Sequence, residues 1–484
     1  MSNLNFISQS TALTLIIVIS LIFVFIGILY SKKNQSLKSY LTANRNVGTF
    51  SLTTSFIASA LGAWILFGPA SAATWGGIGA VIGYALGTAF PMIFLIFLGK
   101  KIRNEFPKGS TLIEFLRKRF KKSLYKIILL MTVFYMFIFL CAEVTAVALL
   151  INYISGTAFW ITSLIILIAT LTYTLYGGLR ASIFTDVIQL ITILVLLLIS
   201  FSYLISLSDS QFSLNFISKN NPHLLSASYI PNYTAGLTFF IAVAATNLFH
   251  QGNWQRVYAA KNNKVLKSSL LFSFITIIPI VLFMGFSGLV AISSDSNVVP
   301  DLGFFSLLLK NQDVFLSIVI IVLGLSLTIS TVDTLVNAIS SLVIVDIKYV
   351  FNFANKTDYL KLSKYFMIFI SIITFFIASK GFSVLYLFLL ADLFCCAFVV
   401  TVFYSFYNKH LTEKIAYISI YAGLIGGLLL FPVPDFSKSL LVGIILPIDF
   451  FPSFFAQSLL FFSFLIATVG PAVVIMIHDS FKGR

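Results

Sequence analysis

The chain has 484 residues, of which 59% are hydrophobic and only 10% are charged, and its mean hydropathy is +1.02. A soluble globular chain carries roughly a quarter charged residues, so this composition excludes a protein that folds in water. The apolar residues form blocks of about 20, which is typical of helical membrane proteins and not of membrane barrels. The net charge of +15 does not indicate nucleic-acid binding, because the basic residues lie in loops between the blocks.

Hydropathy predicts thirteen membrane-spanning helices and therefore an all-α polytopic membrane protein. In chain order they are Leu13–Tyr30, Phe50–Thr74, Ile78–Gly99, Ile127–Ile151, Phe159–Tyr176, Ser182–Ile205, Ala235–Tyr258, Ser268–Ile292, Val314–Ile347, Leu362–Ser379, Val384–Tyr407, Ile415–Phe431 and Ala456–His478.

The distribution of positive charge predicts the topology. The first twelve residues carry no Lys or Arg, whereas Lys32 and Lys33 follow the first span, so we expect no cleavable signal peptide and an external N-terminus. With thirteen spans the C-terminus is then internal. This arrangement puts 27 Lys and Arg residues inside, Arg256 among them, and leaves outside only Lys219, Lys310, Lys380 and Lys438.

Two loops and the cysteines carry further expectations. The internal loop Lys100–Lys126 has an apolar stripe among basic residues, which fits either an interfacial amphipathic helix or a basic loop that only sets topology. The external segment Leu207–Thr234 is long enough to form a lid. Three cysteines, Cys141, Cys395 and Cys396, lie within apolar segments and are expected to be packing residues.

Two spans carry signals of a broken helix. Leu61–Pro69 contains two glycines and a proline, and Asn247–Trp254 places polar residues and a glycine at membrane depth. The two segments are five spans apart, so their helices run in opposite directions. Interrupted spans at corresponding positions of inverted repeats are typical of transporter binding sites.

The predicted organisation follows from that repeat. It comprises an extra N-terminal helix and loop (1–46), a first repeat of five helices (47–206), an external loop (207–234), a second repeat (235–407) and two peripheral C-terminal helices (408–484).

Few acidic residues lie within the spans, and each is a candidate functional residue because a charge at membrane depth is costly. They are Glu143, Asp186, Asp333 and Asp392, with Asp346 at the end of its helix. No Lys or Arg is expected at the centre of a span, so either a bound cation or protonation would neutralise these acids.

One predicted helix carries the densest polar face. Ser330, Asp333, Thr334 and Asn337 share that face at helical spacing, and such oxygen atoms suit a small hard cation. For His250, in the second break, substrate contact and a structural role are equally expected.

Several segments together resemble the sodium:solute symporter family. They are SLKSYLTANRNVGTFSLTTSFIASALGAW, KGSTLIEFLRKRF, YTLYGGLRASIFTDVIQ, NWQRVYAAKN and LTISTVDT. The resemblance implies the LeuT-like 5+5 inverted-repeat fold, in which broken helices surround a binding site near the bilayer midplane. It also implies sodium as the coupling ion.

The resemblance further implies which residues bind sodium. One sodium would be held by the carbonyls of Ala58, Leu61 and Leu327 and the hydroxyls of Ser330 and Thr331. A second sodium, found in some members, would be held by Asp186, Ser330, Asp333 and Thr334.

The substrate is not implied, because proline transporters of the family have an acid, and sugar transporters an amide, where this chain has Ala60. The candidate substrate contacts are Ala60, Trp64, Asn247, His250, Gln251 and Asp392. Asp392 would either meet an amine or be protonated. Without a central Lys or Arg, a substrate carboxylate would rely on helix N-termini.

We therefore expect a sodium-coupled symporter, not an enzyme, that imports a small polar organic solute such as an amino acid, a carboxylate or a urea-like compound. The alternatives are a proton-coupled transporter of the same fold and a proton-translocating respiratory subunit, which would need mid-membrane lysines. A membrane-embedded transferase is discounted because the four histidines are scattered.

The expected partners are the solute, sodium and the lipid bilayer, without nucleic acid or an organic cofactor, in a monomer or weak homodimer. The ratio of 24 Lys to 7 Arg suggests AT-rich coding and a bacterial inner membrane.

Overall fold

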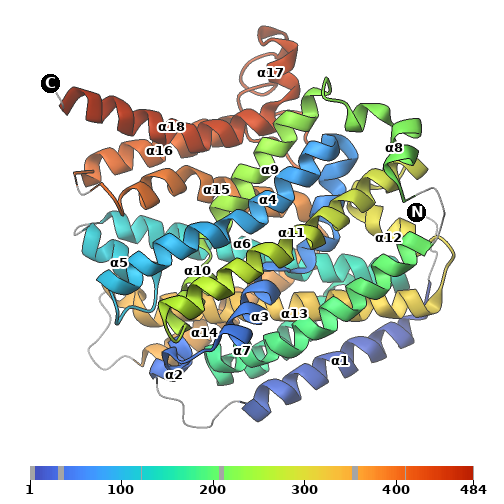
Figure 1. Cartoon of the computed structure of the whole chain (residues 1–484), viewed down its shortest axis with the longest axis horizontal. Helices are drawn as coiled ribbons and strands as arrows, with labels where there is room; N and C mark the ends of the chain where they lie inside the picture. The colour runs from blue at the N-terminus through green and yellow to red at the C-terminus, as the bar shows by residue number, and fades with distance from the viewer. Residues whose placement is uncertain are drawn as a thin grey trace.

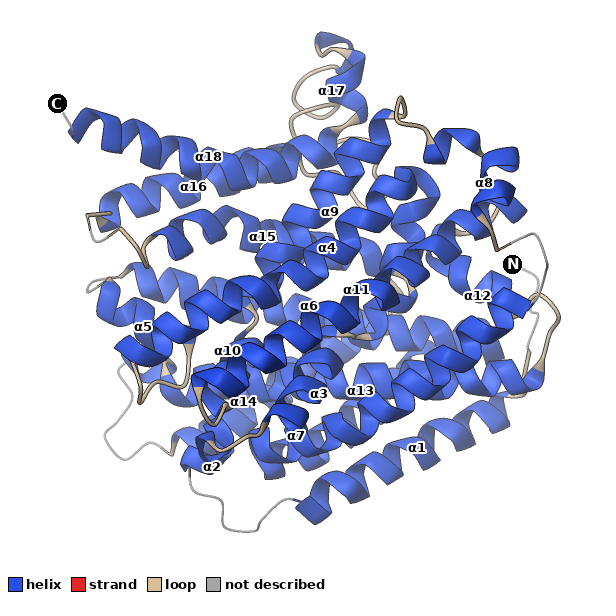
Figure 2. Ribbon diagram, viewed as in Figure 1, coloured by secondary structure: helices blue, strands red, loops and turns tan. Residues whose placement is uncertain are grey.

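The computed structural model of the protein describes residues 6–30, 37–120, 123–206, 212–350, 358–408 and 410–482. Throughout these residues the regular structure is helical, and β pairing is limited to three isolated bridges (Figure 2). Ten of the helices are long and apolar enough to cross a membrane. The prediction of an all-α polytopic membrane protein is therefore confirmed.

The ten long helices are α1 (Gln9–Tyr30), α4 (Gly68–Glu105), α6 (Leu124–Ser155), α7 (Phe159–Ser206), α11 (Asn263–Ser294), α13 (Val314–Val345), α14 (Tyr359–Ala378), α15 (Val384–Tyr404), α16 (Glu413–Leu430) and α18 (Leu459–Lys482). The other α-helices are α2 (Leu37–Thr42), α3 (Thr49–Ala60), α5 (Leu112–Arg119), α8 (Leu214–Asn220), α9 (Ile230–Phe249), α10 (Gln251–Ala259), α12 (Gly303–Leu308) and α17 (Ser453–Gln457). Short 3₁₀ turns include η2 (Ala63–Leu66), η3 (Pro222–Leu225) and η4 (Pro300–Leu302).

Two of the long helices are each interrupted by a glycine. Helix α4 has 38 residues and α7 has 48, whereas about 20 helical residues cross a bilayer. Gly77 in α4 has φ +60° and ψ −159°, and Gly178 in α7 has φ +59° and ψ −160°, a conformation essentially restricted to glycine. Each helix therefore consists of two helical segments joined at its glycine.

The expected total of thirteen spans and the placement of the termini remain predictions.

The helices form a bundle in which α1 lies along α7, while α16 and α18 stack on α15 at the opposite side (Figure 1). Helix α4 packs against both α9 and α11. Helices α2 and α5 lie at one end of the bundle and α8 and α12 at the other (Figure 1). The two chain termini lie at opposite ends of the picture as well.

Corresponding features recur in the two halves of the chain. Helices α6 and α13 both have 32 residues, and each is followed by a further pair of helices. Within that pair a left-handed glycine separates the two helices, Gly178 in the first half and Gly381, with φ +65°, in the second. These features favour the repeat boundaries at 47–206 and 235–407, which remain a prediction.

The basic internal loop contains a helix that packs on the protein. Thr111 and Glu114 form a reciprocal capping box at the start of α5. The predicted stripe of Leu112, Phe115, Leu116 and Phe120 is buried, with no side chain more than 6% exposed. The stripe therefore covers the end of the bundle, and neither sequence-based alternative for this loop, an interfacial helix or a bare basic loop, describes it fully.

The segment considered as a lid is also packed down. Ile217 of α8 and Leu224 of η3 are buried in an apolar cluster with α4 and α11 residues, while 207–211 lie outside the described residues. The three cysteines are free and buried, as expected for packing residues.

The glycine turn in α7 gives a test of this architecture. A Cβ at Gly178 would collide with the Tyr40 ring and would need a backbone conformation that costs about 1–3 kcal/mol for other residues. We expect Gly178→Ala to lower the thermal unfolding temperature of the detergent-purified protein. Gly48→Ala is the matched control, because a Cβ there meets nothing within 4 Å. Equal unfolding temperatures for the two variants would contradict the positive-φ conformation of Gly178 and its close contact with Tyr40.

Candidate functional site

The first break separates α3 from η2 and is held by a buried acid. The hydrogen-bond ladder of α3 ends where the Leu61 N–H donates to the Ile57 carbonyl oxygen (2.9 Å), and Leu61 itself is non-helical. The Ala63 N–H then donates to Glu143 Oε2 on α6 (2.8 Å). A Cβ at Gly62 would collide with that carboxylate, so glycine is needed for this close approach. Glu143 thus replaces a backbone partner that the broken helix lacks.

The second break lies at His250, between α9 and α10. Its backbone is extended, with φ −60° and ψ 106°. Side chains of α10 satisfy the carbonyls at the end of α9: Trp254 Nε1 donates to Leu248 O (2.8 Å), and Asn253 Nδ2 donates to Asn247 O (3.0 Å). The break is therefore built into the sequence NLFHQGNW, whose polar side chains replace the missing ladder.

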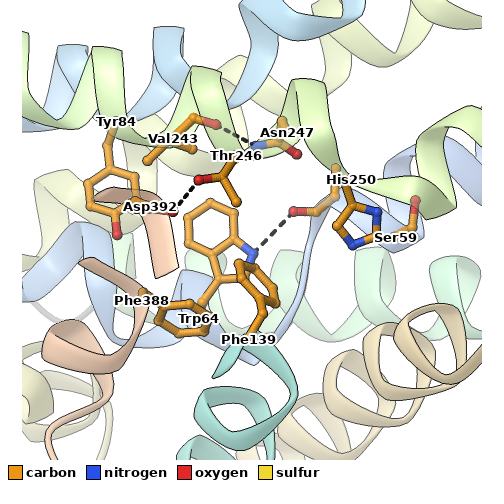
Figure 3. A pocket seen from close by; sticks show the side chains of 11 residues that line it. Ser59, Trp64, Tyr84, Phe139, Val243, Thr246, Asn247, His250, Phe388 and Asp392 are labelled. Atoms are coloured by element: carbon orange, nitrogen blue, oxygen red, sulfur yellow. Dashed lines mark hydrogen bonds between the residues drawn. The ribbon is translucent and has the colours of Figure 1, made fainter. Parts of the chain in front are cut away.

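Between the two breaks lies a small enclosed cavity of about 30 Å³, measured as the space open to the centres of water molecules (Figure 3). That volume is enough for roughly two waters. The cavity is lined by Ser59, Ala60, Trp64, Tyr84, Phe139, Val243, Thr246, Asn247, His250, Phe388 and Asp392. The structure thus brings together five of the six candidate substrate residues.

Asp392 is the acidic group of the cavity. Its Oδ1 accepts a hydrogen bond from the Thr246 hydroxyl, and its side chain is buried, with 5% exposed (Figure 3). No Lys or Arg lines the cavity, and no ion pair found among the described residues includes Asp392. A buried carboxylate in this position must be protonated or must meet a cation that enters the cavity.

Aromatic rings form much of the remaining wall. The Trp64 and Tyr84 rings stack with their centroids 5.6 Å apart, and the Phe139 and Phe388 rings meet edge to face at 4.7 Å. Trp64 is fixed by a hydrogen bond from its indole N–H to the Ala60 carbonyl (3.2 Å, Figure 3). Such faces attract organic ammonium groups.

His250 lies in the cavity wall and in the break at once. Its side chain is 5% exposed, and neither ring nitrogen has a hydrogen-bond partner among the residues that the structure describes. Both nitrogens are therefore available to a solute, while the backbone of the same residue forms the break.

Several lining residues were not predicted. Thr246 lies one helical turn before His250, so the α9 periodicity gave a usable signal for it. Tyr84, Phe139 and Phe388 come from three other helices, α4, α6 and α15, whose long apolar sequences do not mark the residues that face the cavity.

Gln251 does not line the cavity, which corrects its assignment as a substrate contact. Its side chain points toward the basic internal loop, where Nε2 donates to the Ser110 carbonyl (3.1 Å) and Oε1 accepts from the Leu112 N–H (3.3 Å). It is the first residue of α10, and the extended backbone of His250 turns it away from its neighbour. Gln251 thus ties α10 to the start of α5.

A buried ion pair corrects the expectation that the acids within the spans lack a Lys or Arg partner. Arg256 Nη2 on α10 lies 2.8 Å from Asp186 Oδ2 on α7, and both side chains are fully buried. The same guanidinium donates to Ser55 Oγ (2.7 Å) and to Thr334 Oγ1 (3.0 Å). The hydropathy analysis placed Arg256 near the end of a span and counted it with the internal loops, although α10 carries it inward.

The proposed sodium ligands on α13 join this network. Ser330 Oγ donates to Asp186 Oδ1 (2.8 Å), and Thr331 Oγ1 donates to the Leu327 carbonyl one turn earlier (3.1 Å). Helix α13 packs against α3 and η2. The last backbone hydrogen bond of α3 ends on the Ile57 carbonyl, so the carbonyls from Ala58 to Leu61 lack the i+4 backbone donor of a continuous helix. These oxygen atoms suit sodium in chemistry.

Asp333 has a different environment from Asp186. Its carboxylate accepts hydrogen bonds from Tyr173 (2.8 Å), Ser182 (2.7 Å) and Thr185 (3.2 Å), all on α7, and Thr334 Oγ1 lies 3.4 Å from Oδ1. No ion pair of the described residues includes it. Asp186 and Asp333 with Arg256 therefore form a buried cluster with a formal charge of −1.

The ion pair can be tested by its contribution to stability. Arg256→Ala leaves Asp186 buried without its cation, which should cost about 3–5 kcal/mol and lower the unfolding temperature sharply. The double variant Asp186→Asn with Arg256→Gln should recover much of that loss, because neither charge remains unpaired. The exposed Arg180 gives the control Arg180→Ala, which should change stability by no more than about 0.5 kcal/mol. A double variant as unstable as Arg256→Ala would argue against the pair.

Two broken helices around an enclosed cavity, beside a buried cluster of oxygen ligands, define a membrane transporter of the LeuT-like class. Residues 40–425 match the Sodium:solute symporter family, and the chain belongs to that family. It is therefore a transporter and not an enzyme, and family membership supports sodium-coupled transport of a solute. The family resemblance of the sequence motifs is therefore confirmed.

Three curated relatives illustrate the range of similarity. The Spermidine transporter DUR31 of Candida albicans is 26% identical over 384 residues, which cover 78% of this chain and 71% of the relative. Sodium/glucose cotransporter 1 of Ovis aries is 27% identical over 39% of this chain and 29% of the relative. Sodium/myo-inositol cotransporter 2 of Bos taurus is 30% identical, over 35% of this chain and 25% of the relative. The matches to the last two cover less than a third of those proteins.

Solved structures support the fold. A sodium-coupled sialic acid symporter in a substrate-bound outward-open state superposes with a TM-score of 0.71, at 16% identity over 96% of both chains. A nucleobase-cation-symport-1 family transporter in a closed conformation gives 0.51, at 15% identity over 92% of this chain and 96% of the other.

Proposed function

We propose that the protein imports a small organic cation bearing an amine, together with sodium, by alternating access between the two sides of the membrane. The observation that carries the proposal is Asp392, a buried carboxylate in an aromatic cavity that no Lys or Arg lines. An ammonium group would neutralise Asp392 and lie against the rings of Trp64 and Tyr84. The similarity to a protein named as a spermidine transporter supports the same solute class.

The cavity disfavours the other solutes considered from the sequence. A carboxylate would meet the charge of Asp392 without a cation to balance it, since Arg256 is already engaged by Asp186. A neutral solute such as urea would leave the carboxylate uncompensated, unless Asp392 is protonated. Proline and other amino acids would satisfy Asp392 through their amino group but would bring an unpaired carboxylate.

The first sodium is proposed to bind between the end of α3 and α13. Its ligands are the carbonyls of Ala58, Leu61 and Leu327 and the hydroxyls of Ser330 and Thr331. Ala58 and Leu61 directly flank the cavity residues Ser59 and Ala60, so sodium and solute would share one broken helix. That arrangement gives a physical basis for coupling, because both ligands would order the same unwound segment.

The buried ion pair alters the proposal for a second sodium, whose expected ligands are Asp186, Ser330, Asp333 and Thr334. Arg256 already contacts Asp186 and Thr334, so the cluster lacks one positive charge and not two. One sodium at Asp333 or one proton on it would balance that charge. A proton therefore remains the second candidate for the coupling ion, with Asp333, which accepts hydrogen bonds from three hydroxyls, as the group that would bind it.

We further propose a location in a bacterial inner membrane and a monomer or weak homodimer as the working unit, without an organic cofactor. A monovalent amine moved with one sodium ion carries two charges, each worth about 2.3 kcal/mol per 100 mV. Uptake should therefore respond steeply to membrane potential.

The solute class is tested by uptake into proteoliposomes with an imposed inward sodium gradient. Spermidine, putrescine and butylamine should accumulate, whereas proline, urea, glucose and short carboxylates should not. In Asp392→Asn the KM for amines should rise about 10-fold or more, because a hydrogen bond to a charged group is worth about 1.5–3 kcal/mol. Asp313→Asn, which alters an exposed helix cap, is the control. Unchanged amine uptake in Asp392→Asn would exclude the proposed counter-ion.

The coupling ion is tested on α13. Ser330→Ala and Thr331→Ala should each raise the sodium concentration for half-maximal uptake by about 10-fold, because each removes one ligand. Ser326→Ala is the matched control, since the Ser326 hydroxyl donates to the carbonyl of Val322 in its own helix. Uptake that follows a pH gradient and ignores sodium would reject sodium coupling and favour Asp333 as the proton carrier.

A further inference from the structure

A second, larger cavity lies at the end of the bundle that carries the predicted external loops. Its volume is about 440 Å³, and its walls include Ser71 and Trp75 of α4, Asp301 of η4, and Phe436 and Gln457 from the segment between α16 and α18. We call this cavity the vestibule. No Lys, Arg or His is among its lining residues, so Asp301 is its charged group.

Asp301 is held in place within the vestibule wall. It lies in the 3₁₀ turn Pro300–Leu302, which packs against α4, and its carboxylate is hydrogen-bonded by Ser71. Partial burial raises the pKa of the Asp301 carboxyl above its ordinary value, whereas the hydrogen bond from Ser71 opposes that rise. A cation in the vestibule would offset the cost of burying this charge.

A chain of aromatic rings connects the vestibule with the central cavity. Trp75, in the vestibule wall, lies 5.8 Å from Phe239, measured between ring centroids. Phe239 stacks on Tyr84 at 4.7 Å, and Tyr84 stacks on Trp64 at 5.6 Å. Tyr84 and Trp64 line the central cavity (Figure 3).

The two cavities therefore share one chemistry. The residues that line each cavity include one carboxylate and an aromatic wall but no Lys or Arg, and four stacked or tilted rings run from one cavity to the other. Aromatic faces next to a carboxylate attract alkylammonium groups and also accept the methylene chain between them. The small central cavity has room for one ammonium group, and the vestibule has room for a longer chain.

We propose that the vestibule is a second cation-binding site, with Asp301 as its counter-ion, and that the transported solute is a polyamine with one ammonium group at Asp392 and another at Asp301. The contiguous aromatic rings from Trp64 to Trp75 lie between the two sites. The site selects amines that carry at least two separated charges. This inference rests on the proposed function, because it extends the solute of the central cavity.

The test compares amines of one, two and three charges in sodium-driven uptake. In Asp301→Asn the KM for putrescine and spermidine should rise about 10-fold, whereas the KM for butylamine and the sodium dependence should stay unchanged. Asp295→Asn is the matched control, because Asp295 belongs to the same loop but does not line the vestibule. Trp75→Leu provides a second variant that removes an aromatic wall and leaves the charge, and it should also weaken polyamine uptake selectively.

The outcomes separate the two proposals. If the wild-type protein takes up no amine under a sodium gradient, the proposed function fails and the vestibule proposal fails with it. If wild-type uptake is amine-selective but Asp301→Asn raises the KM of butylamine and spermidine equally, only the vestibule proposal is overturned. The same holds if Asp295→Asn reproduces the effect, because long-range surface charge would then explain it.

Discussion

The cost of holding charge in an apolar bundle governs the interior of this protein. Asp186 and Arg256 are fully buried, and their 2.8 Å contact joins α7 to α10. Around that contact, hydroxyls from α3 and α13 complete the hydrogen bonds, so four helices meet at one pair of charges. Asp333 and Asp392 are in no ion pair among the described residues, which is the observation behind the cation sites proposed above.

The breaks in the helices are possible because side chains supply hydrogen-bond partners for the unwound backbone. Glu143 supplies the acceptor that the Ala63 N–H has lost, and Trp254 and Asn253 supply donors for the carbonyls at the end of α9. Unwound backbone is tolerated at membrane depth only when such partners exist. The cavity between the breaks is therefore bordered by unwound backbone whose polar groups already have hydrogen-bond partners on neighbouring side chains.

Much of this structure follows from sequence patterns. Apolar blocks and loop charge predict the helical membrane class, and Gly62 and His250 mark both breaks. Side-chain direction was harder to predict. The sequence predicts Arg256 in an internal loop and Gln251 in the cavity, yet both belong to the short helix α10 that follows the extended residue His250. In this helix Arg256 pairs with the buried Asp186, and Gln251 bonds to Ser110 in the basic loop. Phe139 and Phe388 lie in apolar helices where periodicity does not distinguish a cavity face from a packing face.

The segment between α16 and α18 has one more consequence. It forms part of the vestibule wall through Phe436 and Gln457, and a small apolar cluster around Leu430, Val442 and Leu459 holds it in place. The match to the family ends at residue 425, before this segment begins. This part of the vestibule wall therefore lies outside the part of the chain that the family model describes, and exchanging the segment between relatives would be a compact way to test whether it affects which solute the transporter takes up.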